Sequence, residues 1–375
     1  MIQPMDGYYI GLMSGTSTDG IDGVLAQISS SPDPAQNSVT GMQILASASL
    51  PLPETLRDNL LALNTTGHDE LARAAQAANT LADCYASIVV TLLQDTGLPA
   101  AAIHAIGAHG QTVRHAPESG YTVQINAPAR LVERTGIAVV ADFRSRDVAA
   151  GGQGAPLVPA FHAAQFGNKP GRVILNLGGI ANLTVLSAPV RGFDTGPANM
   201  LMDAWARQHL GVLFDKDGAW AASGQCNPQL LTSLMAEPWL DLPPPKSTGR
   251  DLFNLAWLRT HLQASPQAIT DKDVQATLLQ FSVETIRQAI EQYAPDTQEV
   301  LVCGGGALNT HLMHTLAQAL PCSLETTQAL GVPVQSVEAL AFAWLAHAHL
   351  CGYAACLPAV TGAPKATIAG CLYPV

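Results

Sequence analysis

Residues 8–28, YYIGLMSGTSTDGIDGVLAQI, contain the pattern on which the predicted fold depends. An apolar run leads into a small polar centre and a second apolar run leads out of it, which is typical of two strands joined by a turn. Glycines let such a backbone turn sharply and approach a ligand closely, and its successive N–H groups can hold an anion. The stretch is therefore either an ordinary polar hairpin or a hairpin that binds the phosphates of a nucleotide.

Residues 172–186, RVILNLGGIANLTVL, repeat this pattern in the second half of the chain. Each hairpin is followed by a short apolar strand that runs into a polar or glycine-rich loop, at 103–112 in the first half and at 299–309 in the second. Such internal similarity predicts two related α/β domains. We expect each domain to present a glycine-rich turn to a shared cleft, since clefts between domains are common ligand sites.

The segment 149–159 is rich in glycine and proline and marks the predicted domain boundary. We expect an N-terminal domain of residues 1–148, joined by the tail at about 355–375, and a C-terminal domain of residues 149–354. Residues 109–112 are predicted as a polar loop and residues 192–197 as a turn. Helices are predicted at 53–63, 68–97, 128–135, 199–209, 273–293 and 336–350, and further strands at 42–50 and 137–141.

The composition restricts the class of protein. The 375 residues are 48% hydrophobic and 13% charged, which allows two domains with sizeable cores. The formal net charge of −11 argues against a nucleic-acid or anionic-membrane surface. No secretory signal and no long apolar run is found, so no membrane partner is expected. The seven cysteines are scattered without a C-x-x-C pair, which favours reduced thiols in the cytoplasm.

Two common nucleotide motifs are missing. Neither G-x-x-x-x-G-K-[ST] nor a G-x-G-x-x-G motif at a strand-to-helix junction occurs in the sequence. The two hairpins and the glycine turn at 304–306 resemble instead the actin-like ATPase fold of sugar kinases and heat-shock-type chaperones. This resemblance implies an α/β protein with two duplicated actin-like (ribonuclease H-like) domains, whose mixed sheets surround a central ATP and sugar cleft.

A series of motifs in fixed order resembles one family within that fold, the anhydro-N-acetylmuramic acid kinases. The motifs are GLMSGTSTDGID at 11–22, HGQT at 109–112, ADFR at 141–144, GGQGAPLVP at 151–159, NLGGIAN at 176–182, GFDTGP at 192–197, KSTGR at 246–250 and VCGGGA at 302–307. The resemblance implies hydrolytic opening of the 1,6-anhydro ring of 1,6-anhydro-N-acetylmuramic acid and phosphorylation of O6 by ATP. It further implies Mg²⁺, water as co-substrate, a product of N-acetylmuramic acid 6-phosphate in peptidoglycan recycling, and a homodimer.

Asp194 is the catalytic base that the resemblance implies. The reaction needs a group that accepts a proton from the attacking water, and a carboxylate within hydrogen-bond reach of that water suffices. We expect Asp194 to be ionised, without strong apolar burial. The alternative is a structural role, in an Asx-turn or as the cap of the helix that starts near Asn199.

The nucleotide is predicted to bind along the glycine-rich turns. Asp19 is predicted to contact Mg²⁺ through water, whereas Asp22 either takes part in this site or braces the turn. Each glycine could instead serve only tight packing. The predicted ATP-binding residues are Gly15, Thr16, Ser17, Thr18, Asp19, Gly20, Ile21, Asp22, Asn176, Gly178, Gly179, Gly304, Gly305 and Gly306.

The predicted sugar contacts are Ser14, Gln111, Arg144 and Glu338. The guanidinium of Arg144 suits the lactyl carboxylate through two parallel hydrogen bonds, although an ion pair with a nearby acid is the alternative. Glu338 is expected to reach the sugar from the second domain, or merely to favour a helix N-terminus. His109 and His115 lack a third ligand at suitable spacing, so no His-bound metal is expected.

Two other functions remain open on the sequence. One is an actin-like ATP-binding module whose hydrolysis drives a conformational change, and the other is a kinase of the same fold that phosphorylates an ordinary hexose.

Overall fold

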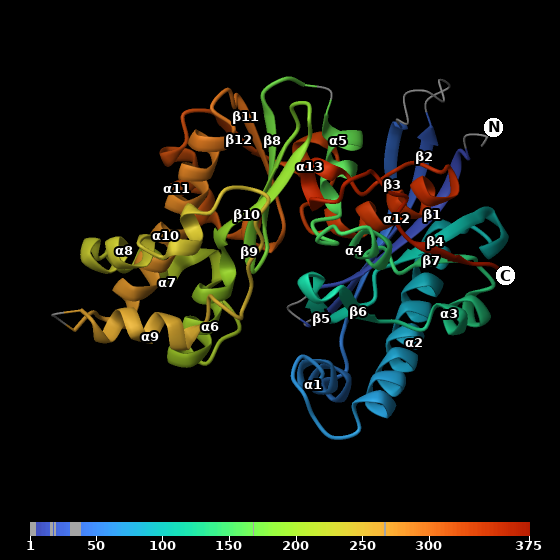
Figure 1. Ribbon diagram of the computed structural model, residues 1–375, viewed down its shortest axis with the longest axis horizontal. Helices are drawn as coiled ribbons and strands as arrows, with labels where there is room; N and C mark the ends of the chain where they lie inside the picture. The colour runs from blue at the N-terminus through green and yellow to red at the C-terminus, as the bar shows by residue number, and fades with distance from the viewer. Residues whose placement is uncertain (1–4, 16–17, 19, 31–38, 168, 266–267) are drawn as a thin grey trace. The chain divides into compact units, whose positions relative to one another are not determined.

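The computed structural model describes residues 5–15, 18, 20–30, 39–167, 169–265 and 268–375 (Figure 1). The chain divides into two compact units. Unit 1 contains the chain up to Phe166 and from Ser336 onward, and unit 2 contains residues 167–335. The observed division therefore differs from the predicted domains, since the helices on both sides of unit 2 belong to unit 1.

These two helices are α5 (Val158–Phe166) and α12 (Val337–Leu350). They pack against each other, and the rings of Phe161 and Trp344 lie 6.2 Å apart between their centroids. Nearly every residue of α12 is buried. A helix that is apolar all round must be covered on all sides, which explains why α12 belongs to the core of unit 1 although it follows unit 2 in the chain.

Unit 1 is built on a six-stranded mixed sheet in the order β13-β7-β4-β1-β2-β3. Strands β1, β2 and β3 form an antiparallel meander, β4 and β7 continue parallel to β1, and β13 of the tail pairs antiparallel with β7. The strands are β1 (Gly7–Ser14), β2 (Gly20–Ser30), β3 (Val39–Pro51), β4 (Ile103–Ala108), β7 (Val139–Ala141) and β13 (Cys371–Tyr373).

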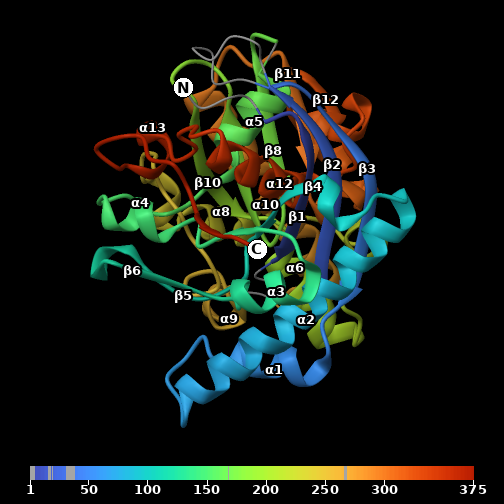
Figure 2. The same ribbon diagram turned by 90° about the vertical axis from the view of Figure 1, so that its right-hand side faces the viewer.

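The predicted helices of unit 1 are present to within a few residues, and α2 and α3 lie side by side (Figure 2). The helices other than α5 and α12 are α1 (Glu54–Ala62), α2 (Glu70–Thr96), α3 (Pro128–Thr135), α4 (Ser145–Ala149) and α13 (Pro358–Thr361). The polar loop predicted at 109–112 is wrong in its second half. Residues 111 and 112 begin β5 (Gln111–Ala116), which pairs with β6 (Tyr121–Ile125) in a separate hairpin. Its side chains are mostly polar, so the alternation that indicates a strand is weak.

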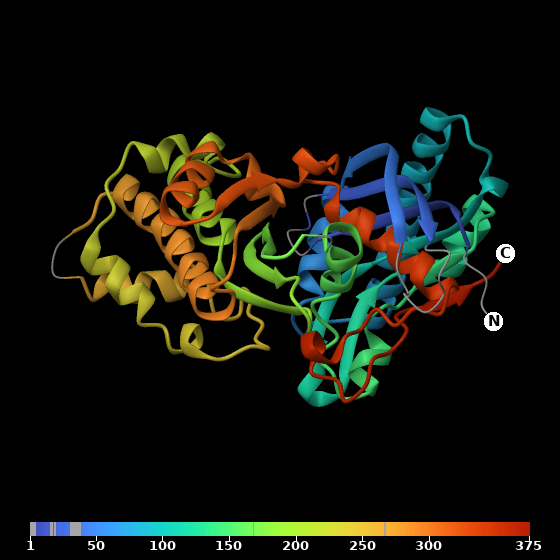
Figure 3. The ribbon, with the colours of Figure 1, turned by 90° about the horizontal axis from the view of Figure 1, so that it is seen from above.

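Helix α12, orange-red in Figure 3, packs against the blue strands β1 and β2 of unit 1, and glycines in the sheet allow this close approach. A Cβ atom on Gly11 of β1 would overlap the Ala339 carbonyl oxygen of α12, and one on Gly107 of β4 would overlap the Phe342 carbonyl oxygen. The neighbouring Leu12 belongs to the apolar cluster that α2 covers. Because successive residues of a strand face opposite sides of the sheet, α12 and α2 cover opposite faces.

Unit 2 repeats the topology of unit 1. Its five-stranded sheet has the order β10-β9-β8-β11-β12, with an antiparallel meander of β8, β9 and β10 and with β11 and β12 parallel to β8. The predicted α/β class with two duplicated domains and mixed sheets is therefore confirmed. The strands are β8 (Arg172–Leu177), β9 (Ile180–Val185), β10 (Arg191–Pro197), β11 (Glu299–Cys303) and β12 (Ser323–Thr326).

An apolar core fills the space between this sheet and its helices, with α10 as the longest helix of the unit. The helices are α6 (Asn199–Leu210), α7 (Ala219–Ala222), α8 (Pro228–Met235), α9 (Leu255–Gln263), α10 (Asp271–Tyr293) and α11 (Thr310–Ala319). Across the described ranges of both units, no helix has the length and apolar character that a membrane span requires.

Candidate active site

The first hairpin of unit 1 has the predicted turn between β1 and β2. The strand register brings Ser14 opposite Ile21. The Thr18 N–H donates to the Gly15 carbonyl at 3.1 Å, and Thr18 has a φ of 55°. Such a left-handed residue is uncommon outside glycine and marks a tight turn. The remaining predicted contacts of this turn, Thr16, Ser17 and the metal candidate Asp19, lie outside the described residues.

Asp22 lies one residue pair further from the turn than Ile21, and its side chain is bonded to the neighbouring strand of the sheet. Its Oδ1 accepts a hydrogen bond of 2.5 Å from Ser49 Oγ of β3. In the register, Asp22 is opposite Met13 of β1 and Ser49 of β3. This contact supports the alternative in which Asp22 braces the hairpin.

Three predicted sugar contacts of unit 1 form one connected network. Ser14 Oγ donates to Gln111 Oε1 at 2.5 Å, and both side chains are buried. The Ser14 carbonyl lies 3.2 Å from His109 Nδ1, and Arg144 Nη2 lies 2.9 Å from His109 Nε2. Arg144 Nη1 donates to the Gly154 carbonyl at 2.8 Å. The motifs at 11–22, 109–112, 141–144 and 151–159 therefore meet at His109 and Arg144.

The charges of this network follow from its burial. Burial, together with the neighbouring Arg144 cation, lowers the pKa of His109 to about 3, so the imidazole is neutral at physiological pH. Burial lowers the pKa of Arg144 to about 10, and the Glu338 carboxylate opposes that change. The expected placement of Glu338 on the second domain is wrong. Glu338 lies in the first turn of α12, which belongs to unit 1.

The second hairpin, in unit 2, is anchored through its carbonyl groups. The Gly178 and Gly179 carbonyls accept hydrogen bonds from the first N–H groups of α6 and its cap. The Asn199 side-chain amide donates to the carbonyls of Leu177 and Gly178 at 3.1 and 2.9 Å. Because the carbonyls are engaged in this way, the turn keeps a defined backbone against which a ligand can lie.

The three glycines after β11 differ in what surrounds them. Gly304 has a φ of 83°, and a Cβ there would overlap Asn176 Oδ1. A Cβ on Gly306 would lie 2.6 Å from Leu177 Cβ. Packing therefore requires glycine at positions 304 and 306. No atom of the described residues lies within 4 Å of where a Cβ on Gly305 would be, so this residue presents open backbone.

Asp194 lies in strand β10 and not in the predicted turn. It is opposite Asn182, and a bulge between Asp194 and Gly196 leaves Thr195 without a partner in the β9 register. Such bulges re-aim side chains near functional sites, and glycines at 192 and 196 made the segment look like a turn. Asp194 does not cap α6, because the N-cap of that helix is Ala198.

One oxygen of the Asp194 carboxylate is held by the loop at 246–250. Oδ2 accepts from Ser247 Oγ at 3.0 Å and from the Thr248 N–H at 2.9 Å. Within the described part of the chain, no donor bonds to Oδ1. Burial raises the pKa of Asp194 to about 6, although the Thr248 and Ser247 bonds and the Lys246 cation lower it. The side chain is only half-buried by its exposed surface, and with a pKa of about 6 the group is mostly ionised at neutral pH.

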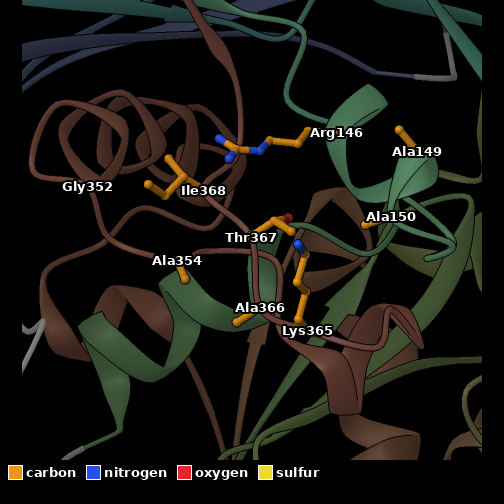
Figure 4. A pocket seen from close by; sticks show the side chains of 9 residues that line it. All are labelled: Arg146, Ala149, Ala150, Gly352, Ala354, Lys365, Ala366, Thr367 and Ile368. Atoms are coloured by element: carbon orange, nitrogen blue, oxygen red, sulfur yellow. The ribbon is translucent and has the colours of Figure 1, made fainter.

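A separate pocket in unit 1 contains none of the predicted site residues, and the described residues contain no cluster that could hold a metal ion. A pocket of about 580 Å³ lies between α4, the end of α12 and the tail, and none of the predicted site residues lines it (Figure 4). Its lining residues are Arg146, Ala149, Ala150, Gly352, Ala354, Lys365, Ala366, Thr367 and Ile368. Among the described residues of the whole chain, no group of three or more His, Cys, Asp or Glu side chains could hold a metal ion.

Sequence reasoning missed His109 as a member of the unit 1 network, and it missed Ser247 and Thr248 as partners of Asp194 in unit 2. Each lies in a motif that was recognised as a whole, so the signal was present. The sequence does not show which polar atoms are in contact with one another. His109 was weighed only as a metal ligand, whereas its ring nitrogens contact a carbonyl and a guanidinium.

Comparison with known proteins identifies the family. A family model described as anhydro-N-acetylmuramic acid kinase matches residues 7–375. Proteins named anhydro-N-acetylmuramic acid kinase from Bordetella petrii and Bordetella pertussis are 58% and 57% identical, each over 98% of this chain and 96% of its own length. The solved xylulose kinase of Rhodospirillum rubrum aligns at 13% identity and a TM-score of 0.46, over 91% of this chain and 89% of its own. The chain therefore belongs to the anhydro-N-acetylmuramic acid kinase family.

Proposed function

We propose that this protein uses ATP and water to open the 1,6-anhydro ring of 1,6-anhydro-N-acetylmuramic acid and to phosphorylate O6. The products are N-acetylmuramic acid 6-phosphate and ADP, as peptidoglycan recycling requires. The observation that carries the proposal is Asp194, whose carboxylate has one oxygen held by two donors and the other without a donor among the described residues. Relatives that match this chain over nearly their full length bear the name of this activity.

Asp194 acts as the general base. A water oxygen attacks the anomeric carbon and gives one proton to Asp194 Oδ1, while the bond from that carbon to O6 breaks. The released O6 forms its new bond to the γ-phosphorus of ATP, whose bond to the bridging oxygen of ADP breaks. A base with a pKa near the working pH is effective in such a step, and the value of about 6 for Asp194 meets this condition.

Unit 1 supplies the groups that hold the sugar. Arg144 remains protonated at neutral pH and suits the lactyl carboxylate of the substrate. Its Nε is buried and has no hydrogen-bond partner among the described residues. A buried unpaired donor is costly, and an anionic ligand would relieve that cost. Ser14, Gln111 and Glu338 are the further sugar contacts in this proposal.

ATP is proposed to bind at the three glycine-rich turns. Gly305 supports this assignment, because its open backbone would let the nucleoside lie close. Mg²⁺ bound by ATP takes most of its ligands from phosphate and water. This suits a protein whose described residues contain no cluster of three metal-binding side chains. When bound, Mg²⁺ neutralises phosphate charge, and Asp19 is the proposed protein contact through water.

The proposal also covers the cellular compartment, the oligomeric state and the partners of the protein. We place the protein in the cytoplasm as a homodimer, with the sugar, ATP and water as its partners. The net charge of −11 supports the expectation that no nucleic acid and no anionic membrane is bound.

A turnover assay separates the candidate functions. With Mg²⁺ and ATP, we expect ADP to accumulate only when the anhydro-sugar is present, with one phosphosugar formed for each ADP. ADP released at the same rate without sugar, and without a phosphosugar, would favour the ATP-driven conformational module. Faster phosphorylation of glucose or free N-acetylmuramic acid than of the anhydro-sugar would favour an ordinary hexose kinase.

A further inference from the structure

His109 is held rigidly at the end of β4, inside unit 1. Its backbone N–H donates to the Leu12 carbonyl of β1 at 3.0 Å. Its ring lies 4.7 Å from the ring of Phe342 on α12, measured between centroids, and the residue is only 4% exposed. The ring therefore has one orientation, fixed by the same sheet and helix that pack through Gly11 and Gly107.

The partners of the ring determine its tautomer. A carbonyl oxygen can only accept, so Nδ1 must carry the proton that is donated to Ser14. A guanidinium can only donate, so Nε2 must be the acceptor for Arg144 Nη2. A second proton on Nε2 would face the Arg144 cation. The neutral imidazole is therefore the only form that satisfies both contacts.

The two terminal nitrogens of Arg144 are fixed by acceptors on different segments. Nη1 donates to the Gly154 carbonyl and Nη2 donates to His109. A planar guanidinium with two of its five N–H groups held in this way cannot rotate. Its Nε and remaining N–H groups keep one direction, which is what a bidentate contact to a carboxylate requires.

We propose that His109 is a positioning residue that orients Arg144 for the carboxylate of the sugar substrate. This inference rests on the proposed function, because it assigns the ligand of Arg144 within that reaction. His109 thereby contributes to selection of sugars that bear a carboxylate substituent over those that lack one. It is not a catalytic residue, since it acts through Arg144.

Two substitutions of His109 distinguish the contact of its ring with Arg144 from the contact with Ser14. In His109→Gln the terminal amide lies near the position of Nε2, and its oxygen can still accept from Arg144. In His109→Asn the shorter amide can still donate to Ser14 but leaves Arg144 Nη2 without its acceptor. We expect His109→Asn to raise the KM for the anhydro-sugar about tenfold or more, as for a lost hydrogen bond to a charged group. The sugar KM of His109→Gln should stay within about threefold of that of the unchanged protein. The KM for ATP should be similar in the two variants.

A double-mutant cycle measures whether the effects of substituting His109 and Arg144 on the sugar KM depend on each other. A purely structural role of His109 would not produce such a dependence. We would compare the sugar KM of His109→Asn, of Arg144→Ala and of the double variant. The melting temperature of each variant serves as the control for folding. If His109 acts through Arg144, the Asn substitution has almost no further effect on the sugar KM in the Arg144→Ala background. Additive effects, or equal losses for Gln and Asn, would overturn the inference. Failure of the unchanged protein to phosphorylate the anhydro-sugar would instead overturn the proposed function.

Discussion

Replacing Asp194 by asparagine is expected to lower kcat about a thousandfold at pH 7, within the range that general bases contribute. The amide has nearly the shape of the carboxylate. Its oxygen can accept the bonds that Ser247 and Thr248 now donate to Oδ2. Its nitrogen then takes the place of Oδ1 and cannot accept a proton from water. The substitution therefore removes the base while the loop at 246–250 keeps its anchor.

Kinetics and binding must be measured on the same preparation of the Asp194→Asn protein. Turnover should be lost, whereas the dissociation constants for ATP and for the anhydro-sugar, measured by calorimetry, should stay within a few-fold of their original values. An unchanged melting temperature serves as the control for folding. If both ligands fail to bind, Asp194 has a structural role and the assignment of the base is wrong.

The pKa of the Asp194 carboxylate predicts how kcat/KM changes with pH on the acid side. Because the base must be deprotonated, kcat/KM should fall as the pH drops through the pKa of about 6. Ser247→Ala removes a hydrogen bond that stabilises the charged form, so its profile should shift to higher pH. Ser247→Thr keeps the hydroxyl and is the matched control. A profile that is flat down to pH 4.5 would contradict the assignment.

Gly107→Ala is expected to destabilise unit 1 by more than about 3 kcal/mol, at the upper end of the cost of overpacking. The added Cβ would overlap the Phe342 carbonyl oxygen of α12. This is a backbone atom of a buried helix and cannot move aside as a flexible side chain could. The melting temperature should fall by roughly 6 to 12 °C, given the usual slope for a domain of this size, or the protein should fail to accumulate in soluble form.

Gly41→Ala is the matched control for this prediction. Gly41 is also a strand glycine of unit 1, in β3, but none of the described atoms lies within 4 Å of where its Cβ would be, and its φ is not in the left-handed region. Its melting temperature should change little. Equal melting temperatures for Gly107→Ala and Gly41→Ala would mean that α12 does not pack on β4 as described.

The duplicated fold could be predicted because it is encoded by local patterns. Two apolar runs around a glycine-rich centre, each followed by a further buried strand, recur in both halves of the chain. Five strands follow the same order in both sheets, and β13 of the tail is an addition to the sheet of unit 1. Strand β10 and hairpin β5–β6 were missed for a physical reason. Glycines in the first and polar side chains in the second hide the alternation on which strand prediction depends.

The composition of the site could be predicted only in part. Sequence motifs indicated Ser14, Gln111 and Arg144 together, but not the imidazole that joins them. The placement of Glu338 was wrong because α12 follows unit 2 in the chain while its burial ties it to unit 1. Such long-range packing depends on tertiary contacts that no local pattern reports.

The origin of the new anomeric oxygen tests the central claim most directly. The reaction is run in water enriched in heavy oxygen, and the phosphosugar is analysed by mass spectrometry soon after its formation, before the anomeric oxygen exchanges with water. If water opens the anhydro ring, the anomeric hydroxyl carries one label and O6, now bonded to phosphorus, carries none. A phosphosugar without label at the anomeric carbon, formed from the same substrate, would contradict hydrolytic ring opening and with it the role of Asp194 as the base.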